Sequence, residues 1–175
     1  MKVPKKSPPP TFKEYPAERL MIESLRSRLN ASEDQLRIEI MNRIIDGGGP
    51  LQVTDLLKDS PEDTASIFQR LQEKQVIVLD GNAEVIQFVY PVSSLPTPHR
   101  VTLADGRSFF SMCAIDSIGA AFTLNQNTYV ESQCSVCGTP VSLSVHDRQL
   151  MDVQPDSLHI IHVDLNKSEN WAGSC

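Results

Sequence analysis

The chain has 175 residues, a formal net charge of −6 and a hydrophobic content of 40%. A chain of this length predicts one or two domains, and its apolar content is enough for a buried core, which excludes a wholly disordered protein. The acidic balance argues against a protein whose main role is to hold nucleic acid or an anionic membrane.

The start of the chain predicts no regular structure. Five of the twelve prolines fall in the first 16 residues, and we expect residues 1–15 to be a disordered tail. Pro16 suits the first turn of a helix, and apolar residues at helical spacing follow it. Ser32 with Gln35 three residues later predicts a capping box for a second helix, which the glycines at 47–49 would end.

Two further helices are predicted before the chain changes character. Residues 51–58 form a short run with apolar positions at helical spacing. Ser60 as a cap and Pro61 in the first turn predict another helix over 61–74.

A β-hairpin follows these helices. Two β-rich runs, 76–79 and 85–89, flank a turn that contains Asp-Gly-Asn. Helices followed by a hairpin are typical of a winged helix. We therefore assign residues 16–91 to a helical, winged-helix-like domain.

The second half of the chain predicts a different architecture. Residues 92–98 have the composition of a linker, and the compact apolar segment 113–122 predicts a short buried helix. Runs of β-branched and aromatic residues predict strands at 101–103, 108–110, 128–132, 141–145 and 158–164. Residues 99–175 therefore predict an α+β domain with a mainly antiparallel sheet, and the fold class expected for the chain is α+β.

The four cysteines point to reduced thiols. No apolar run approaches the ~20 residues of a membrane span, and the basic, proline-rich start has no apolar stretch behind it, so neither a span nor a secretory signal is predicted. We expect a cytoplasmic protein. In that compartment cysteines serve more often as metal ligands or catalysts than in disulfides.

Cys113 and Asp116 form the first candidate pair. Positions i and i+3 of a helix share a face, so a helix over 113–122 would place the Cys113 sulfur near the Asp116 carboxyl group. A helix that starts near Cys113 also favours the thiolate through its dipole. The pair would then be a soft-metal ligand beside a proton carrier. Spacing alone favours a plainer alternative, in which Cys113 is a small core residue and Asp116 a polar cap.

The segments around this pair resemble the organomercurial (alkylmercury) lyase family. The order of the matching segments and the gaps between them fit the family as well. The match is strongest over residues 99–145 and extends loosely to both sides. The segments are residues 99–103 (HRVTL), 106–110 (GRSFF), 113–118 (CAIDSI), 131–134 (ESQC) and 138–143 (GTPVSL).

The resemblance implies protonolysis of a carbon–mercury bond, which yields a hydrocarbon and a mercuric ion. Cys113 and Asp116 match the family's first catalytic cysteine and its aspartate, and Cys175 stands where the second catalytic cysteine is expected. These three residues would contact mercury, which is substrate and product, so no cofactor is expected. External thiols, the mercuric reductase or another thiol carrier would accept the metal. We expect no nucleic acid and no membrane among the partners.

This chemistry gives a physical reason for the residue types. Mercury is a soft metal, and thiolates are its preferred ligands. Two thiolates weaken the Hg–C bond and make the carbon more basic, so that Asp116 can protonate it as a general acid. The apolar neighbours expected to exclude water and to favour protonated Asp116 are Phe109, Phe110, Ile115 and Ile118.

The chain departs from the family pattern in two places. Met112 stands before Cys113, where the family usually has an aromatic residue. The sequence stops at Cys175, without the sheet and helix that normally follow the second cysteine. We therefore expect a C-terminally incomplete form with a poorly positioned second thiol.

A second pair of cysteines forms the motif Cys134-x-x-Cys137-Gly. Such a knuckle is half of a zinc site, and the histidines at 146, 159 and 162 complete no familiar zinc spacing. A structural turn with incidental thiols is the preferred interpretation. A metal clip or an auxiliary mercury trap is the alternative.

Two other functions compete with the lyase. One is a winged-helix, metal-responsive transcriptional regulator, and the other is a family member that binds mercury or another soft metal without turnover. The candidate recognition helix, 61–74, carries two basic and three acidic residues, and the turn 80–84 is also acidic. A helix that reads DNA should be basic, so the lyase is the preferred hypothesis.

Overall fold

The computed structural model describes residues 25–58 and 63–161. Several predicted features lie outside the residues that the structure describes. They involve the tail 1–15, Pro16, Ser60, Pro61, His162 and Cys175.

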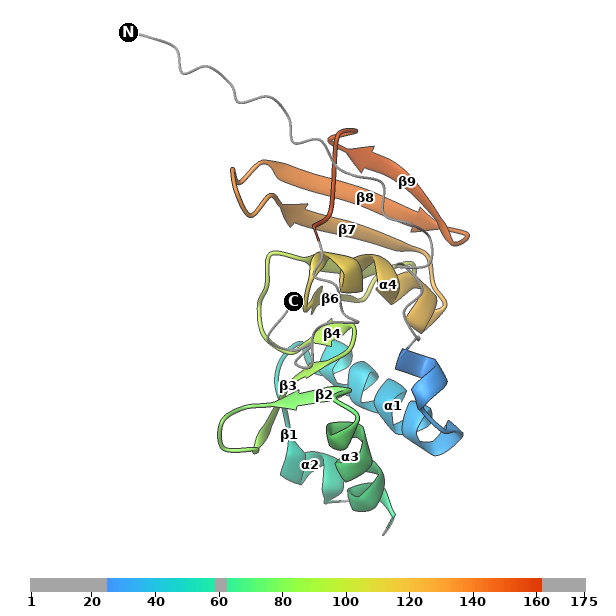
Figure 1. Ribbon diagram of the computed structural model, residues 1–175, viewed down its shortest axis with the longest axis vertical. Helices are drawn as coiled ribbons and strands as arrows, with labels where there is room; N and C mark the ends of the chain where they lie inside the picture. Colours follow the sequence, from blue (N-terminus) through green and yellow to red (C-terminus); the bar gives the residue numbers. More distant parts are fainter. Residues whose placement is uncertain (1–24, 59–62, 162–175) are drawn as a thin grey trace, which may run out of the picture.

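Helices come first along the chain, and strands dominate its second half (Figure 1). The helices are the 3-10 helix Leu25–Arg28, α1 (Ala31–Gly47), α2 (Val53–Leu57), α3 (Thr64–Glu73) and α4 (Ala114–Leu124). The strands are β1 (Leu51–Gln52), β2 (Ile77–Leu79), β3 (Val85–Val89), β4 (Val92–Ser93), β5 (Arg100–Leu103), β6 (Ser108–Ser111), β7 (Thr128–Gln133), β8 (Pro140–His146) and β9 (Gln149–Gln154). Within the described ranges, no helix has the length and apolar character that crossing a membrane requires.

The strands form one antiparallel sheet, so the expected α+β class is confirmed. Their order is β1-β3-β4-β6-β5-β7-β8-β9, and β2 pairs with β3. The short strand β4 pairs with β3 on one side and with β6 on the other, which joins the strands of the two halves. The prediction of a linker over 92–98 is therefore wrong at its start, because Val92 and Ser93 are buried residues of the sheet.

The first half has the element order that a winged helix requires. α1, α2 and α3 precede the β2–β3 hairpin, whose two strands lie within the predicted runs 76–79 and 85–89. The short predicted helix 51–58 is divided, since its first two residues form β1 and pair with β3. The winged-helix assignment and the domain limits 16–91 and 99–175 stay predictions.

The start of α1 corrects the predicted capping box. Asn30 is the cap: its side-chain oxygen accepts from the Glu33 amide at 2.9 Å, and the Glu33 carboxylate accepts from the Asn30 amide at 2.9 Å. The Ser32 hydroxyl instead donates to the Asn30 side chain. The prediction of Ser32 with Gln35 is wrong because Asn30 is an equally good cap two residues earlier, with a glutamate in the reciprocal position.

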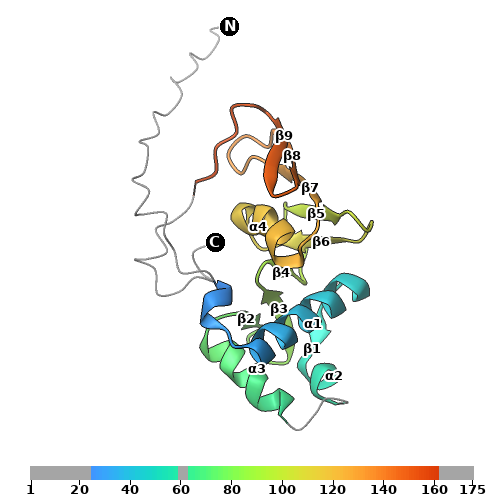
Figure 2. The same ribbon diagram turned by 90° about the vertical axis from the view of Figure 1, so that its right-hand side faces the viewer.

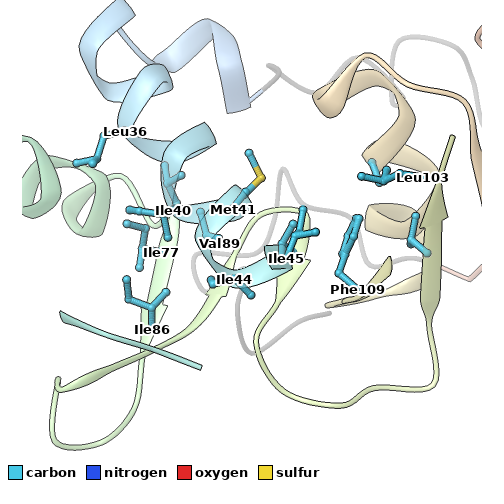
Figure 3. Packing of buried hydrophobic residues seen from close by; sticks show 14 of the residues in the cluster. Leu36, Ile40, Met41, Ile44, Ile45, Ile77, Ile86, Val89, Leu103 and Phe109 are labelled. Atoms are coloured by element: carbon cyan, nitrogen blue, oxygen red, sulfur yellow. The ribbon is translucent and has the colours of Figure 1, made fainter. Parts of the chain in front are cut away.

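The hydrophobic core runs across both halves of the molecule. One face of α1 packs against the β2–β3 hairpin (Figure 3), and α3 adds Phe68 and Leu71. Leu103 and Phe109 from the second half belong to the same cluster. Burial of each such side chain contributes about 1.5–3 kcal/mol. The α1 residues of the cluster are Leu36, Ile40, Met41, Ile44 and Ile45.

The last strand also differs from the prediction. Residues 158–161, the described part of the predicted strand 158–164, form no strand. Instead, β9 pairs with β8 through a tight turn in which Asp147 and Arg148 both have positive φ values, 49° and 64°. Such a turn ordinarily carries Asn-Gly or Asp-Gly. The strand was missed because neither that signal nor an alternation of buried and exposed residues marks β9.

A buried carboxylate ties α1 to α3. Glu33 is 1% exposed, and it accepts hydrogen bonds from Lys74 at 2.6 Å and from Arg70 at 3.1 Å. The hydrogen bond from Lys74, followed by that from the Asn30 amide, lowers the pKa of Glu33 below its ordinary 4.5. Folding therefore stabilises the charged form of the Glu33 side chain relative to its neutral form.

We expect Glu33→Gln to lower the free energy of unfolding by about 1–3 kcal/mol near neutral pH, since it leaves two cations without their shared partner. Because the pKa of Glu33 is depressed in the folded state, its contribution is present above the ordinary value of 4.5 and is lost as the pH falls below it. Urea unfolding at about pH 7 and at about pH 3 measures this contribution. The difference in free energy of unfolding between wild type and variant should be smaller at the acidic pH. An equal difference in free energy of unfolding at both pH values would show that the charge of Glu33 does not stabilise the fold.

Candidate active site

The structure brings Cys113 and Asp116 together at the start of α4. β6 ends at Ser111, and Cys113 is the N-cap of α4, with extended backbone angles (φ −145°, ψ 176°). The Cys113 thiol donates a hydrogen bond to Asp116 Oδ2, with 3.3 Å between the sulfur and the oxygen. Both side chains are half-buried. The sulfur and the carboxyl group are therefore close enough to exchange a proton.

The start of α4 supplies the electrostatic setting of this pair. The first-turn amides of a helix carry the positive end of its dipole, which favours an anion at the cap. Cys113 occupies that cap and has no side-chain capping bond of its own to the backbone. The helix start therefore contributes a field that favours a negative charge on the Cys113 sulfur.

Packing fixes the direction of α4. The helix lies on one face of β5, β6 and β7 (Figure 2). Ala120 and Ala121 are buried against that face, together with Phe109 and Val130 from the strands. Small residues allow the helix to approach the sheet closely. This contact fixes the helix start, and with it the positions of Cys113 and Asp116.

A cleft of about 710 Å³ opens beside Asp116. Asp116 lies on one wall with Gly119 and Phe122, and the opposite wall comes from the first half of the chain, including Tyr90 and Pro91. Its lining residues among those described are Leu25, Arg26, Asp34, Arg37, Ile38, Tyr90, Pro91, Asp116, Gly119, Phe122, Thr123, Asn125 and Arg148. Asp116 thus borders a space large enough for a small organic group.

Ion pairing organises the far wall of the cleft. The Arg37 side chain is 5% exposed and pairs with Asp34 at 2.7 Å. Its guanidinium also donates to the backbone oxygen of Tyr90 at 3.0 Å. Arg37 therefore holds α1 against the end of β3, which keeps the Tyr90 side of the cleft in place.

The expected apolar shield around Asp116 is partly wrong. Ile115 is 43% exposed, and Phe109 is buried in the core rather than in the cleft. The apolar side chains that line the cleft with Asp116 include Tyr90 and Phe122. Sequence reasoning missed Tyr90 because it lies 26 residues before Asp116, and only the packing of α1 on both halves brings the two together.

The other candidate residues are dispersed. Cys134 and Cys137 lie in the turn between β7 and β8, and His146 and His159 are exposed. His159 bonds the backbone oxygen of Ser157 rather than a cysteine. Among the residues that the structure describes, no group of three or more His, Cys, Asp or Glu side chains is arranged to hold a metal ion.

The candidate recognition helix offers few unpaired cations. α3 carries Arg70 and is followed by Lys74, and both form ion pairs with the buried Glu33. Cations engaged in this way are less available for phosphate contacts. This observation weighs against the regulator alternative.

These features define an α+β protein with a cysteine–aspartate pair at the start of a helix that lies on an antiparallel sheet. The family model for alkylmercury lyase matches residues 92–175. The resemblance to the alkylmercury lyase family inferred from the sequence is therefore confirmed for residues 92–175.

Individual similar proteins agree with this match. The chain is 26% identical over 110 residues to the alkylmercury lyase of Staphylococcus epidermidis, covering 63% of this chain and 50% of that protein. It is 37% identical over 60 residues to the alkylmercury lyase of Streptomyces lividans, covering 34% and 27%. The crystal structure of the mercury-bound form of MerB2 aligns with a TM-score of 0.58 and 25% identity, covering 76% of this chain and 65% of that one. The chain thus spans about half the length of the first of these relatives.

Proposed function

We propose that this protein is an organomercurial lyase, which cleaves the carbon–mercury bond by protonolysis and yields a hydrocarbon and Hg(II) in mercury detoxification. The observation that carries the proposal is the 3.3 Å contact between Cys113 and Asp116 at the start of α4. It lies within the segment that matches the alkylmercury lyase model. Relatives named alkylmercury lyase support the same chemistry.

In the first step, the Cys113 sulfur binds the mercury of an organomercurial cation and loses its proton. The hydrogen bond runs from Cys113 to Asp116, so the carboxylate is the nearest acceptor for that proton. A bond forms between sulfur and mercury, and Asp116 becomes a carboxylic acid. Soft thiolates are suited to this metal, whereas a carboxylate alone is a poor competitor for it.

In the second step, Asp116 returns the proton to the carbon bound to mercury. The electron pair of the Hg–C bond forms the new C–H bond, the hydrocarbon leaves, and mercury stays on sulfur as Hg(II). A second thiolate on mercury raises the basicity of the carbon and favours this transfer. The cleft beside Asp116 gives the organic group an apolar wall in Phe122 and Tyr90.

The proposed reaction requires no resident cofactor, because mercury is both substrate and product. External thiols, or a thiol carrier such as the mercuric reductase, would remove the product by ligand exchange. Such exchange requires reduced thiols, and we propose the cytoplasm as the compartment.

The test of this function is incubation of the protein with an organomercurial and excess thiol, followed by detection of the hydrocarbon. Release at a rate above that of thiol alone supports the lyase. Binding of the organomercurial without hydrocarbon release would instead identify the non-catalytic alternative.

Cys175 is the proposed second ligand, and we expect Cys175→Ser to slow hydrocarbon release. Misplacement of a reacting group by ~1 Å can lower a rate about a hundredfold, so a poorly positioned Cys175 should already limit the rate. Its loss should lower the rate further when external thiol is kept low. Rates at low and at high external thiol check this, since a small thiol should partly replace the missing sulfur. An unchanged rate at low thiol would remove Cys175 from the site.

A further inference from the structure

We propose that Cys134 and Cys137 form a second thiophilic-cation site, a dithiol that binds one mercuric ion in two-coordinate geometry, separate from Cys113 and Asp116. Neither the proposed lyase chemistry nor the family match assigns a metal to this pair. Binding at this site does not depend on carbon–mercury cleavage.

The two cysteines belong to one short, closed turn. β7 ends at Gln133 and β8 begins at Pro140, and these two residues are paired in the ladder. Within the turn, the Cys134 amide donates to the Thr139 oxygen at 2.9 Å, and the Gly138 amide donates to the Cys134 oxygen at 2.8 Å. Gly138 has a φ of 69°, a conformation that favours glycine. These bonds fold the Cys-x-x-Cys segment on itself and hold both thiols on one loop.

The two thiols of this turn are accessible, and hydrogen bonding favours the thiolate form of Cys137. Cys137 is exposed, Cys134 is half-buried, and neither forms a disulfide. The Thr139 hydroxyl lies 3.1 Å from the Cys137 sulfur. This hydrogen bond, followed by the Thr139 amide and the Cys134 thiol, lowers the pKa of Cys137. A larger thiolate fraction favours metal binding, because the thiolate is the ligand.

The ligand set selects the class of cation. Residues 132–145 contain no Asp, Glu or His, so the turn itself offers neither a carboxylate nor an imidazole beside its two sulfurs. Structural zinc takes four ligands, and within the described ranges no cluster of three or more ligating side chains exists to supply them. Two sulfurs without a carboxylate ligand suit a soft cation that accepts two-coordinate, near-linear bonding. Binding releases two protons, one from each thiol, and forms two Hg–S bonds.

The position of the turn adds a second observation. β6, β5 and β7 are neighbours in the antiparallel sheet, and the end of β6, the start of β5 and the end of β7 lie at the same end of that sheet. His99 lies next to β5. Its backbone oxygen accepts from the Ser111 amide at 2.8 Å, and its ring Nδ1 lies 2.8 Å from the Ser132 hydroxyl. Two strand spacings, roughly 10 Å, therefore separate Ser111 from Ser132.

Cys113 follows Ser111 by two residues, and Cys134 follows Ser132 by two residues. The segments that carry Cys113 and Cys134 therefore both begin at the same end of the sheet.

The experiment uses the full chain with Cys113→Ser and Cys175→Ser, which leaves two of the four cysteines, Cys134 and Cys137. Reduced protein is titrated with mercuric chloride. Native mass spectrometry gives the stoichiometry, and a thiol reagent counts the free sulfurs. We expect one mercuric ion per monomeric chain and the loss of both reactive thiols. Mercury-bridged dimers, or two mercuric ions per chain, would overturn the dithiol.

Two further variants in the same background sharpen the result. Cys137→Ser removes an exposed sulfur, and we expect half a mercuric ion per chain, in bridged dimers, with retention against a small monothiol at least about tenfold weaker. Val136→Ser is the matched control, since Val136 is 92% exposed in the same turn and supplies no sulfur. The Val136→Ser chain should bind one mercuric ion, as does the chain that carries only Cys113→Ser and Cys175→Ser. Equal retention by the Cys137→Ser chain would overturn the proposal, as would tight binding of one zinc ion by the background chain.

Discussion

Cys113→Ser should reduce hydrocarbon release from an organomercurial to the background rate, a loss of about three orders of magnitude or more. The hydroxyl is a poor ligand for a soft metal, so the first step of the proposed reaction fails. The variant should nevertheless fold, because Cys113 is the N-cap of α4 and serine is among the best residues at that position.

Hydrocarbon yield, measured by gas chromatography, and thermal unfolding together check this prediction. The expected result is an unchanged or slightly higher unfolding temperature with no turnover. Activity near that of the wild type would exclude the lyase mechanism built on Cys113. A variant that loses both activity and stability would show that the plainer structural interpretation of Cys113 is correct.

Asp116→Asn should still bind the organomercurial and should cleave it about 10²–10⁴-fold more slowly, the usual range for loss of a general acid. The amide keeps the size of the carboxyl group and has no transferable proton. The Cys113 sulfur remains as a mercury ligand, so binding and cleavage should separate. Mercury content after gel filtration measures binding, and single-turnover hydrocarbon release measures cleavage.

Asp34→Asn is the matched control for this variant. Asp34 lines the same cleft, but its carboxylate pairs with Arg37 and lies on the opposite wall. We expect cleavage to fall far less than in Asp116→Asn, because no hydrogen bond joins Asp34 to Cys113. Stability should fall by about 1 kcal/mol, because Arg37 loses a charged partner. If the Asp34→Asn and Asp116→Asn variants slowed cleavage equally, the effect would belong to the cleft as a whole and not to a proton from Asp116.

The errors of the sequence prediction have a common origin. Local rules predict Ser32 rather than Asn30 as the cap of α1, because several polar residues near a helix start satisfy the same rule. Val92 and Ser93 were assigned to a linker because a two-residue strand has no detectable periodicity, and its pairing with β3 and β6 is non-local. β9 was missed for a similar reason, since pairing with β8 rather than its own apolar pattern holds it.

The sequence by itself determined the features that depend on neighbours along the chain. The β2–β3 hairpin follows from two β-rich runs around a turn, and the contact of Cys113 with Asp116 follows from the i, i+3 geometry of a helix that begins at the cysteine. The closed turn that carries Cys134 and Cys137 is likewise local, because its hydrogen bonds join residues at most five positions apart.

Only the tertiary structure decided what surrounds those local features. The cleft beside Asp116 requires Arg37 and Tyr90 from the first half, held by a hydrogen bond between residues 53 positions apart. Cys113 and Cys134 follow strands that end on the same side of the sheet only because the strand order is β6-β5-β7. Such arrangements arise from burial of apolar surface and from sheet pairing summed over the whole chain, so no short stretch of sequence encodes them.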